Sequence, residues 1–171
     1  IIIVTKSQIN ESNTKYAQGG IAIVFDKKDS FEKHINDTII AGDNLCDEEI
    51  VNLVVKEAPK CLKLLMRWGV NFDVNNNGKL DLGKEGGHSE NRIVHHKDIT
   101  GLEIERSLLK SVEAKGNINV LSNHFVIDLI SEMNKTKGCS LESSTCYGAY
   151  ILDKSSRVIN KCISKITLLA T

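Results

Sequence analysis

The sequence predicts an α/β fold that ends in a β-meander, and three observations lead to this class. The chain opens on Ile1–Val4, an unbroken apolar run typical of a strand buried on both faces of a parallel sheet. Between residues 30 and 115, apolar side chains recur at helical spacing. After residue 116, short apolar runs separated by turn residues predict antiparallel strands attached to the α/β core.

The composition excludes several classes of protein. The chain has 171 residues, of which 41% are hydrophobic and 26% are charged, as in globular domains. Its 22 basic residues equal its 22 acidic residues, so no basic field is available for nucleic acid or a membrane surface. No apolar run reaches the ~20 residues of a membrane helix, and no signal peptide is recognised. Five cysteines without a C-x-x-C pair indicate reduced thiols, so we expect a cytoplasmic protein.

Both ends of the sequence are typical of strands. The chain opens on "IIIVTK" without a methionine and closes on "ITLLAT". Apolar β-branched runs of this kind leave strand edges that need partners. We therefore expect residues 1–171 to be an internal segment of a longer protein and to form one partial domain.

The first elements are a loop, a strand and a helix. The polar stretch Lys6–Gly20 is expected to be a loop, and Ile21–Phe25 a short strand. Ser30 is a suitable N-cap for a helix that ends at Gly42.

Two more helices and a hairpin are expected next. Asp47 is a suitable N-cap for the first of these helices. Because proline has no backbone N–H, Pro59 is expected to end it and to begin another helix over residues 60–68. Val70–Val74 and Lys79–Leu82 flank an Asn/Gly-rich tip and predict the hairpin.

The second half of the chain is expected to contain one helix and several strands. Thr100 and Glu103 have the spacing of a capping box, which predicts a helix that ends near Lys115. The polar residues 131–145 predict a loop. Strands are predicted at residues 118–121, 125–130, 146–153 and 157–171.

The stretch "FDVNNNGKLDLGKEGGHS", residues 72–89, comes close to two ligand-binding motifs and completes neither. As a calcium loop starting at Asp73, it has Lys84 where the bidentate carboxylate belongs. As a phosphate-binding loop, it has Glu85 where Ser or Thr must follow the lysine. The spacing of the nearby histidines is not that of metal ligands, so no metal site is predicted; these histidines are His88, His95 and His96.

Two polar segments are unusually specific: "SNTKYAQGGIA" over residues 12–22 and "EGGHSENRIVHHKDITG" over residues 85–101. The first follows the predicted buried strand, so it lies at the carboxyl edge of a sheet, where α/β proteins bind nucleotides. Its hydroxyls, amides and bare glycine backbone can donate hydrogen bonds to a phosphate or a flavin ring. The simpler interpretation is that both segments have ordinary loop composition.

With these segments the sequence resembles the L-aspartate oxidase family, flavoenzymes related to the flavoprotein subunits of succinate dehydrogenase and fumarate reductase. The similarity includes "SNTKYAQGGIAIVFD", "WGVNFD" and "EGGHS", and it spans essentially the whole chain. It implies a partial Rossmann-like FAD-binding domain that lacks its first βα unit, with a helical excursion before the β-meander.

The resemblance also implies positions for the cofactor. Lys6 is expected near the adenosine half of FAD, Phe125 and Val126 are expected to contact adenine through their backbone, and Thr171 is expected to begin a turn near the cofactor. Eight consecutive residues are expected to wrap the pyrophosphate and the isoalloxazine: Asn13, Thr14, Lys15, Tyr16, Ala17, Gln18, Gly19 and Gly20.

Two positions bear on cofactor attachment and substrate choice. Asn13 occupies the place of the histidine to which related dehydrogenases attach FAD, so the resemblance implies non-covalent FAD. Glu85 is expected to pair with the ammonium of L-aspartate, which succinate lacks. Without the resemblance, Glu85 would be interpreted as a solvated surface acid. His88 and Ser89 are expected to line the same site.

The implied reaction is oxidation of L-aspartate to iminoaspartate, with oxygen or fumarate as the electron acceptor and quinolinate synthase as a partner. Residues 1–171 alone are expected to be inactive, because the residues that clamp the substrate carboxylates would lie elsewhere. The alternatives are a flavoprotein of the fumarate reductase or succinate dehydrogenase kind and a non-catalytic nucleotide-binding domain.

Overall fold

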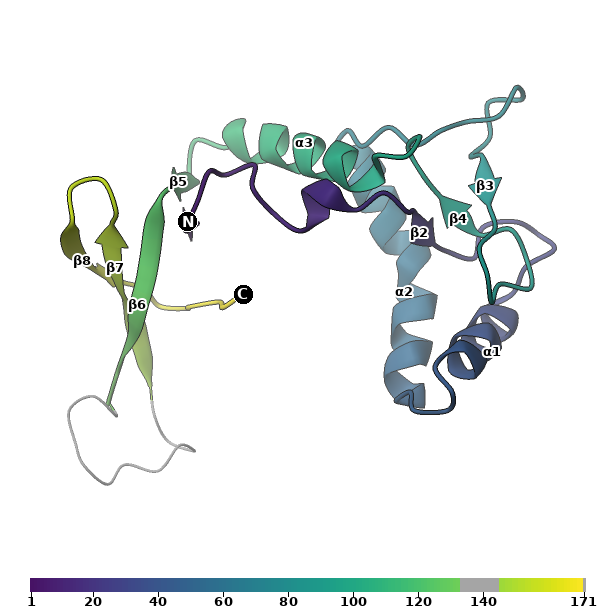
Figure 1. Ribbon diagram of the computed structural model, residues 1–171, viewed down its shortest axis with the longest axis horizontal. Helices are drawn as coiled ribbons and strands as arrows, with labels where there is room; N and C mark the ends of the chain where they lie inside the picture. The colour runs from purple at the N-terminus through teal and green to yellow at the C-terminus, as the bar shows by residue number, and fades with distance from the viewer. Residues whose placement is uncertain (133–144, 171) are drawn as a thin grey trace. The chain divides into compact units, whose positions relative to one another are not determined.

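The computed structural model describes residues 1–132 and 145–170 (Figure 1). The chain divides into two compact units. The central unit is Ser12–Lys115, and the flanking unit combines Ile1–Glu11 with Gly116–Thr171. Most of the loop predicted over residues 131–145, and the predicted cofactor residue Thr171, lie outside the described residues.

The flanking unit contains one parallel pair of strands. β1 (Ile2–Val4) runs parallel to β5 (Asn119–Leu121), with Ile3 opposite Val120. The parallel pairing of residues 1–4 is as predicted, but burial of β1 on both faces is not. The strand predicted over residues 118–121 pairs with β1 and does not belong to the meander. Ile2 is 50% exposed, because among the described residues β5 is the only strand hydrogen-bonded to β1.

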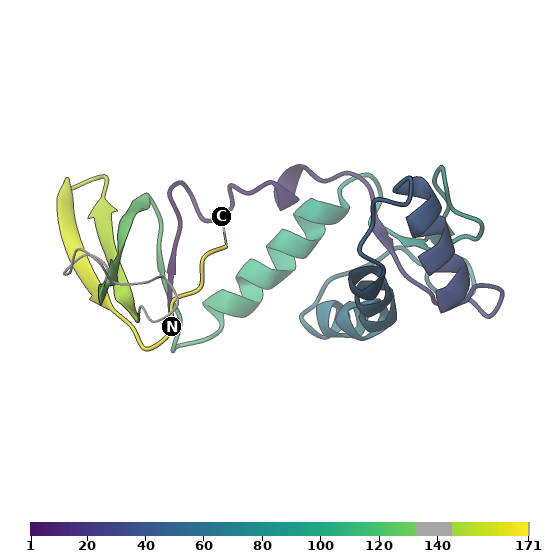
Figure 2. The same cartoon turned by 90° about the horizontal axis from the view of Figure 1, so that it is seen from below.

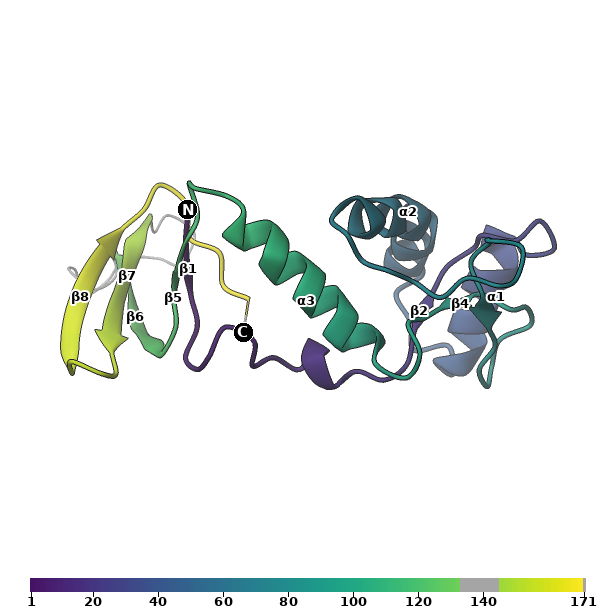
Figure 3. The ribbon, with the colours of Figure 1, turned by 90° about the horizontal axis from the view of Figure 1, so that it is seen from above.

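The same unit contains the predicted meander. β6 (His124–Ser131), β7 (Cys146–Asp153) and β8 (Val158–Ile163) form an antiparallel sheet in chain order (Figure 3). The strand predicted over residues 157–171 is therefore too long. β8 ends at Ile163, opposite Gly148, because β7 begins only two residues earlier and offers little further backbone for pairing.

Two helices of the central unit pack against each other (Figure 2). α1 spans Phe31–Ala41, and the Ser30 side chain accepts a hydrogen bond from Lys33 N–H at 3.2 Å. α2 spans Glu48–Arg67, and the Asp47 carboxylate accepts a hydrogen bond from Ile50 N–H at 3.2 Å. Both N-caps are therefore as predicted, since each satisfies a donor that the helix leaves unpaired.

Pro59 does not divide α2 into two helices, so the prediction of a new helix over residues 60–68 is wrong. Proline has no N–H, which leaves the carbonyl of Val55 without its usual helical donor. The apolar face nevertheless continues through this point, because Val55 and Leu62 are 4% and 2% exposed. Burial along one face of a long helix outweighs the loss of one hydrogen bond.

α3 spans Thr100–Glu113, close to the predicted helix, but the predicted capping box does not form. The Thr100 hydroxyl accepts a hydrogen bond from His96 N–H at 3.0 Å. The Glu103 carboxylate accepts one from Asn71 N–H at 2.9 Å. Both side chains therefore connect α3 to other segments instead of capping it.

A small antiparallel sheet completes the central unit, with β4 (Ile93–Val94) between β2 (Ile21–Ala22) and β3 (Leu82–Gly83). The predicted hairpin is reduced to a single bridge between Val74 and Leu80. The sheet and α2 share one apolar core, whose buried members are Ile23, Leu62, Val70, Phe72 and Val94.

Candidate functional site

The cofactor loop, defined here as Ser12–Gly20, lies along the N-terminal end of α3 (Figure 2). It contains a single 3₁₀ turn, η1 (Thr14–Tyr16). Its backbone is tied to the helix by Gly101 N–H, which donates to the Ala17 carbonyl at 2.9 Å. Its polar side chains are mostly exposed, and the Gln18 amide donates to Asp98 at 3.3 Å.

Gly20 joins the cofactor loop to the small sheet. A β-carbon at Gly20 would lie 2.4 Å from both the Val94 carbonyl oxygen and Cγ2 of Ile93, so no side chain fits. Exposed side-chain amides and a hydroxyl on a backbone with two bare glycines suit the polar parts of FAD. On these residues the fit to the predicted cofactor is good.

The predicted substrate residues Glu85 and His88 lie in one tight turn, residues 85–88, which is called the substrate turn below. His88 N–H donates to the Glu85 carbonyl at 3.2 Å, and Gly87 between them has a φ of +84°, a conformation that glycine adopts without strain. The turn is next to the cofactor loop, because a β-carbon at Gly19 would lie 3.7 Å from Oε1 of Glu85. The structure thus brings the two predicted segments together.

The Glu85 carboxylate has no partner within the part of the chain that the structure describes. It is exposed, and neither a hydrogen bond nor an ion pair there engages its side chain. Its charge is therefore available to a cation brought by a ligand. By contrast, Asp29 and Asp37 in the same unit are paired with Arg92.

Arg92 is the centre of a buried ion cluster behind this turn. Its side chain is 0% exposed, and Nε and Nη2 donate to the two carboxylate oxygens of Asp29 at 3.0 and 2.8 Å. Nη1 donates to Oδ2 of Asp37 on α1 at 2.6 Å. A two-point contact of this kind fixes the orientation of the guanidinium and the carboxylate together.

Asp37 connects this cluster to the substrate turn. Its Oδ2 accepts hydrogen bonds from the backbone N–H and the hydroxyl of Ser89, at 2.7 and 2.8 Å. Burial alone would raise the pKa of Asp37, but the hydrogen bonds from Ser89 and Arg92 lower it to about 2. The carboxylate is therefore ionised at neutral pH and holds the residue that follows His88.

Two imidazoles meet beside the cluster. His34 on α1 and His88 have ring centroids 6.3 Å apart in an edge-to-face arrangement. Nδ1 of each ring is buried without a hydrogen-bond partner in the described residues. Burial, followed by the nearby Arg92 charge, lowers the pKa of His34, so this ring is neutral at pH 7.

Two further histidines, His95 and His96, contact Asp73. Nδ1 of His95 is 3.2 Å from Oδ2 of Asp73, and Nδ1 of His96 is 3.7 Å from Oδ1. Asp73 also accepts a hydrogen bond from Lys97 N–H at 2.5 Å. In the described residues no three His, Cys, Asp or Glu side chains are grouped to hold a metal ion.

The remaining predicted cofactor residues belong to the flanking unit. The turn before β6 holds the segment after β1, because His124 N–H donates to the Thr5 carbonyl at 3.0 Å, which brings Lys6 and Phe125 into the same region. Val126 lines a largely apolar cleft of about 920 Å³ between β1 and the end of the chain. Lys6 and Phe125 are exposed, as contact with a ligand requires.

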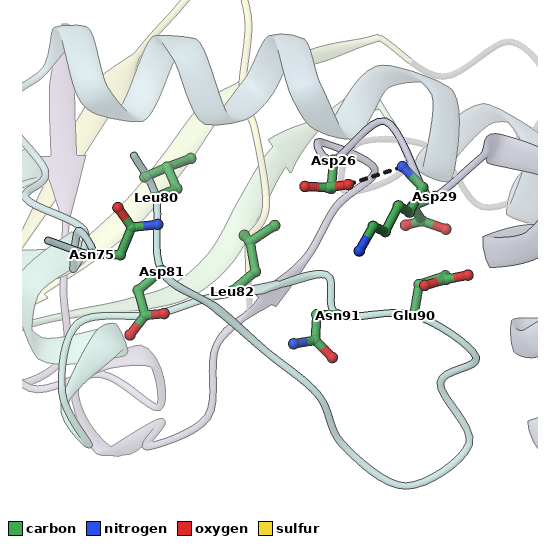
Figure 4. A pocket seen from close by; sticks show the side chains of 9 residues that line it. Asp26, Asp29, Asn75, Leu80, Asp81, Leu82, Glu90 and Asn91 are labelled. Carbon is green, nitrogen blue, oxygen red and sulfur yellow. Dashed lines mark hydrogen bonds between the residues drawn. The ribbon is translucent and has the colours of Figure 1, made fainter. Parts of the chain in front are cut away.

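A polar cavity of about 410 Å³ in the central unit contains none of the predicted site residues (Figure 4). Three of its acids already have partners: Asp29 binds Arg92, Asp26 accepts Lys28 N–H at 2.9 Å, and Glu90 pairs with Lys33 at 2.6 Å. Its lining residues are Asp26, Lys28, Asp29, Asn75, Leu80, Asp81, Leu82, Glu90 and Asn91. We therefore place the candidate site at the cofactor loop and the substrate turn.

The sequence reading gave no role to Asp29, Asp37 or Arg92, although they support the substrate turn. One signal was available, because Arg92 directly precedes the apolar pair that forms β4. An arginine at the start of a buried strand needs an acidic partner. The sequence does not say which of the 22 acidic residues supplies it.

Comparison with known proteins places the chain in context. Residues 1–171 match the FAD binding domain family. The chain is 46% identical over 172 residues to the chloroplastic L-aspartate oxidase of Oryza sativa subsp. japonica, covering 100% of this chain and 26% of that protein. It is 38% identical over 176 residues to L-aspartate oxidase of Vibrio cholerae serotype O1, covering 100% and 32%. The chain thus spans about a quarter to a third of the length of these curated relatives.

Solved structures share the fold. A variant of E. coli quinol fumarate reductase FrdA has a TM-score of 0.78 at 26% identity, covering 90% of this chain and 24% of that one. Mycobacterium smegmatis Sdh1 has a TM-score of 0.74 at 28% identity, covering 88% and 26%. The predicted α/β fold is confirmed.

Among the described residues, no helix combines the length and apolar character needed to cross a bilayer.

Proposed function

The chain belongs to the FAD binding domain family, and on this premise we propose that the protein oxidises L-aspartate to iminoaspartate. Its curated relatives named L-aspartate oxidase, at 35% to 46% identity, support the proposal. The observation that carries it is the unpartnered carboxylate of Glu85 beside the cofactor loop at Gly19.

FAD, when bound, supplies the acceptor for the hydride that leaves Cα of the substrate. The eight residues from Asn13 to Gly20 would hold its pyrophosphate and ring, and Lys6, Phe125 and Val126 would hold its adenosine half. FAD is bound non-covalently, because Asn13 has no nucleophilic nitrogen with which to form a bond to the flavin.

Glu85 selects the amino acid over the plain dicarboxylate. Its carboxylate accepts charge-assisted hydrogen bonds from the substrate ammonium. Succinate brings no cation, so it gains nothing from Glu85 and places its own negative charges near another one. His88, in the same turn, lines the site with its half-buried ring.

Three further expectations belong to this proposal. Oxygen or fumarate accepts the electrons, and quinolinate synthase receives the product. The protein acts in the cytoplasm, although the Oryza sativa relative is named as a chloroplastic protein.

The proposal is tested by substrate discrimination in the full-length protein with Glu85→Gln. Loss of a hydrogen bond to a charged group costs about 1.5–3 kcal/mol, so kcat/KM for L-aspartate should fall roughly 10- to 100-fold. Activity with succinate should not fall. Glu90→Gln is the matched control, because it removes a carboxylate from the same loop that is already paired with Lys33 at 2.6 Å.

Equal loss of kcat/KM in both variants would show that Glu85 does not contact the substrate. Turnover of succinate as fast as L-aspartate by the unsubstituted protein would favour the alternative, a fumarate reductase-like flavoprotein. That alternative has support from the similarity to quinol fumarate reductase. A full-length protein without flavin absorbance would favour the non-catalytic binding domain.

A further inference from the structure

The backbone of the cofactor loop rests directly on the first turn of α3. A β-carbon at Gly101 would lie 1.8 Å from the Thr14 carbonyl oxygen and 2.8 Å from the β-carbon of Ala17. These distances leave no room for a side chain at Gly101. The close packing at Gly101 and the hydrogen bond from Gly101 N–H to the Ala17 carbonyl therefore hold the loop against α3.

One turn further along the same face of α3, Glu105 holds the start of the loop. The Ser12 hydroxyl donates to Oε1 of Glu105 at 2.7 Å, and Ser12 Oγ accepts from Lys15 N–H at 3.3 Å. Residues four apart in a helix lie on one face, so Gly101 and Glu105 contact the loop together. Ser12 thus connects the Glu105 side chain to the backbone of η1 through two hydrogen bonds.

The partner of Glu105 is unusual for a buried acid. The residue is 8% exposed, and in the described residues no cation pairs with it. Burying a carboxylate is expensive unless hydrogen bonds stabilise it. The Ser12 hydroxyl supplies such a bond, so the loop and the helix depend on each other at this point.

We propose that Glu105 is a positioning residue for FAD, which acts through Ser12 to fix the backbone of residues 12–17. The loop then meets the cofactor with Asn13 and Thr14 already in place, so that less ordering is needed when FAD binds. This inference rests on the family to which the chain belongs and not on the proposed aspartate activity.

The test is a double-substitution cycle on FAD affinity in the full-length protein without substrate. The apoprotein is titrated with FAD, and binding is followed by quenching of flavin fluorescence. Ser12→Ala and Glu105→Leu should each raise the Kd about 10-fold, and the two together should raise it no more than either alone. Glu105→Gln keeps an acceptor for the hydroxyl and should stay within about 3-fold of the unsubstituted protein.

Glu113→Gln is the matched control, because it removes an exposed carboxylate from the last turn of α3. It should leave the Kd for FAD unchanged, and visible circular dichroism of the bound flavin should change only in the Ser12 and Glu105 variants. Independent effects that multiply to about 100-fold in the combined variant would overturn the proposal. An unchanged Kd in Ser12→Ala would also overturn the proposal. Ser12 is a partly exposed loop residue, so this substitution leaves the helix intact.

The result is separate from the proposed reaction. A protein that fails to oxidise L-aspartate but shows the coupled loss of FAD affinity supports the positioning role and rejects only the substrate. A protein that oxidises L-aspartate with additive effects on FAD affinity rejects the positioning role alone.

Discussion

Replacing Arg92 by methionine should strongly increase the local opening of α1 and of the substrate turn. The guanidinium is 0% exposed and donates four hydrogen bonds, two to Asp29, one to Asp37 and one to Ser89. Methionine fills a similar volume without charge. The substitution leaves the Asp29 carboxylate, whose side chain is also 0% exposed, buried without its cation.

The size of the effect follows from that unpaired charge. Removing one partner from a buried ion pair costs about 3–5 kcal/mol. At about 1.4 kcal/mol per factor of ten, a cost of about 4 kcal/mol raises the population of locally open molecules roughly 10³-fold. The four hydrogen bonds are not added to this figure, because they describe the same interaction.

Native-state hydrogen exchange followed by mass spectrometry measures this opening peptide by peptide. In full-length Arg92→Met, amides of residues 31–41 and 86–94 should exchange roughly 10³-fold faster. The control is Lys60→Met, which removes a cation 73% exposed in its pair with Glu57 and should change exchange by less than about fivefold.

A second substitution separates charge from packing. In Arg92→Met combined with Asp29→Leu, the uncompensated carboxylate is gone, so at least tenfold of the lost protection should return, roughly the part caused by the buried charge. The reasoning is refuted if Arg92→Met exchanges no faster than Lys60→Met. It is also refuted if the second substitution makes exchange faster still.

Three further predictions concern the loop, the acid response and the flavin. Gly20→Ala should abolish FAD binding, whereas Gly19→Ala should retain it, because the added β-carbon meets backbone at 2.4 Å in the first case and only the tip of a side chain at 3.7 Å in the second; FAD titration decides. The pKa values of Asp37 and Glu103 are about 2, below their ordinary 3.8 and 4.5, so the stability they contribute is present above about pH 5 and is lost as the pH falls toward 2. Far-UV circular dichroism across this window should show unfolding that Asp37→Asn makes less steep. Acid precipitation of the holoprotein should release all flavin into the supernatant, since Asn13 forms no covalent bond, and flavin retained in the pellet would contradict this.

Local signals predicted the local structure well. Ser30 and Asp47 cap their helices because an N-cap depends on the residue itself and on amides two or three positions away. The prediction of a break at Pro59 in α2 is wrong for the opposite reason. Whether a helix continues through Pro59 depends on what its face is packed against, and that packing comes from β2 and β4, far away in the chain.

Glu103 shows the same limit at a cap. Its spacing from Thr100 is that of a capping box, but its carboxylate binds Arg106 and Asn71 N–H instead. The hydrogen bond from Arg106, with that from Asn71, lowers the pKa of Glu103 to about 2 against the effect of burial. The contact with Asn71 N–H, together with the ion pair to Arg106 on the same helix, outweighs a local bond to a helix end that water can also satisfy.

The candidate site divides its acidic residues into two kinds that the sequence does not distinguish. One kind already has partners and fixes the position of the backbone. Asp29 binds Arg92, Asp37 accepts a hydrogen bond from Ser89, and Glu105 accepts one from Ser12. Glu85 has none of these contacts and lies beside Gly19. A carboxylate that is already satisfied gains little from a substrate, whereas an unpartnered one gains a hydrogen-bonded cation. The acids that support the site and the acid proposed to select the substrate are therefore separated by their existing partners, and only the folded chain reveals those partners.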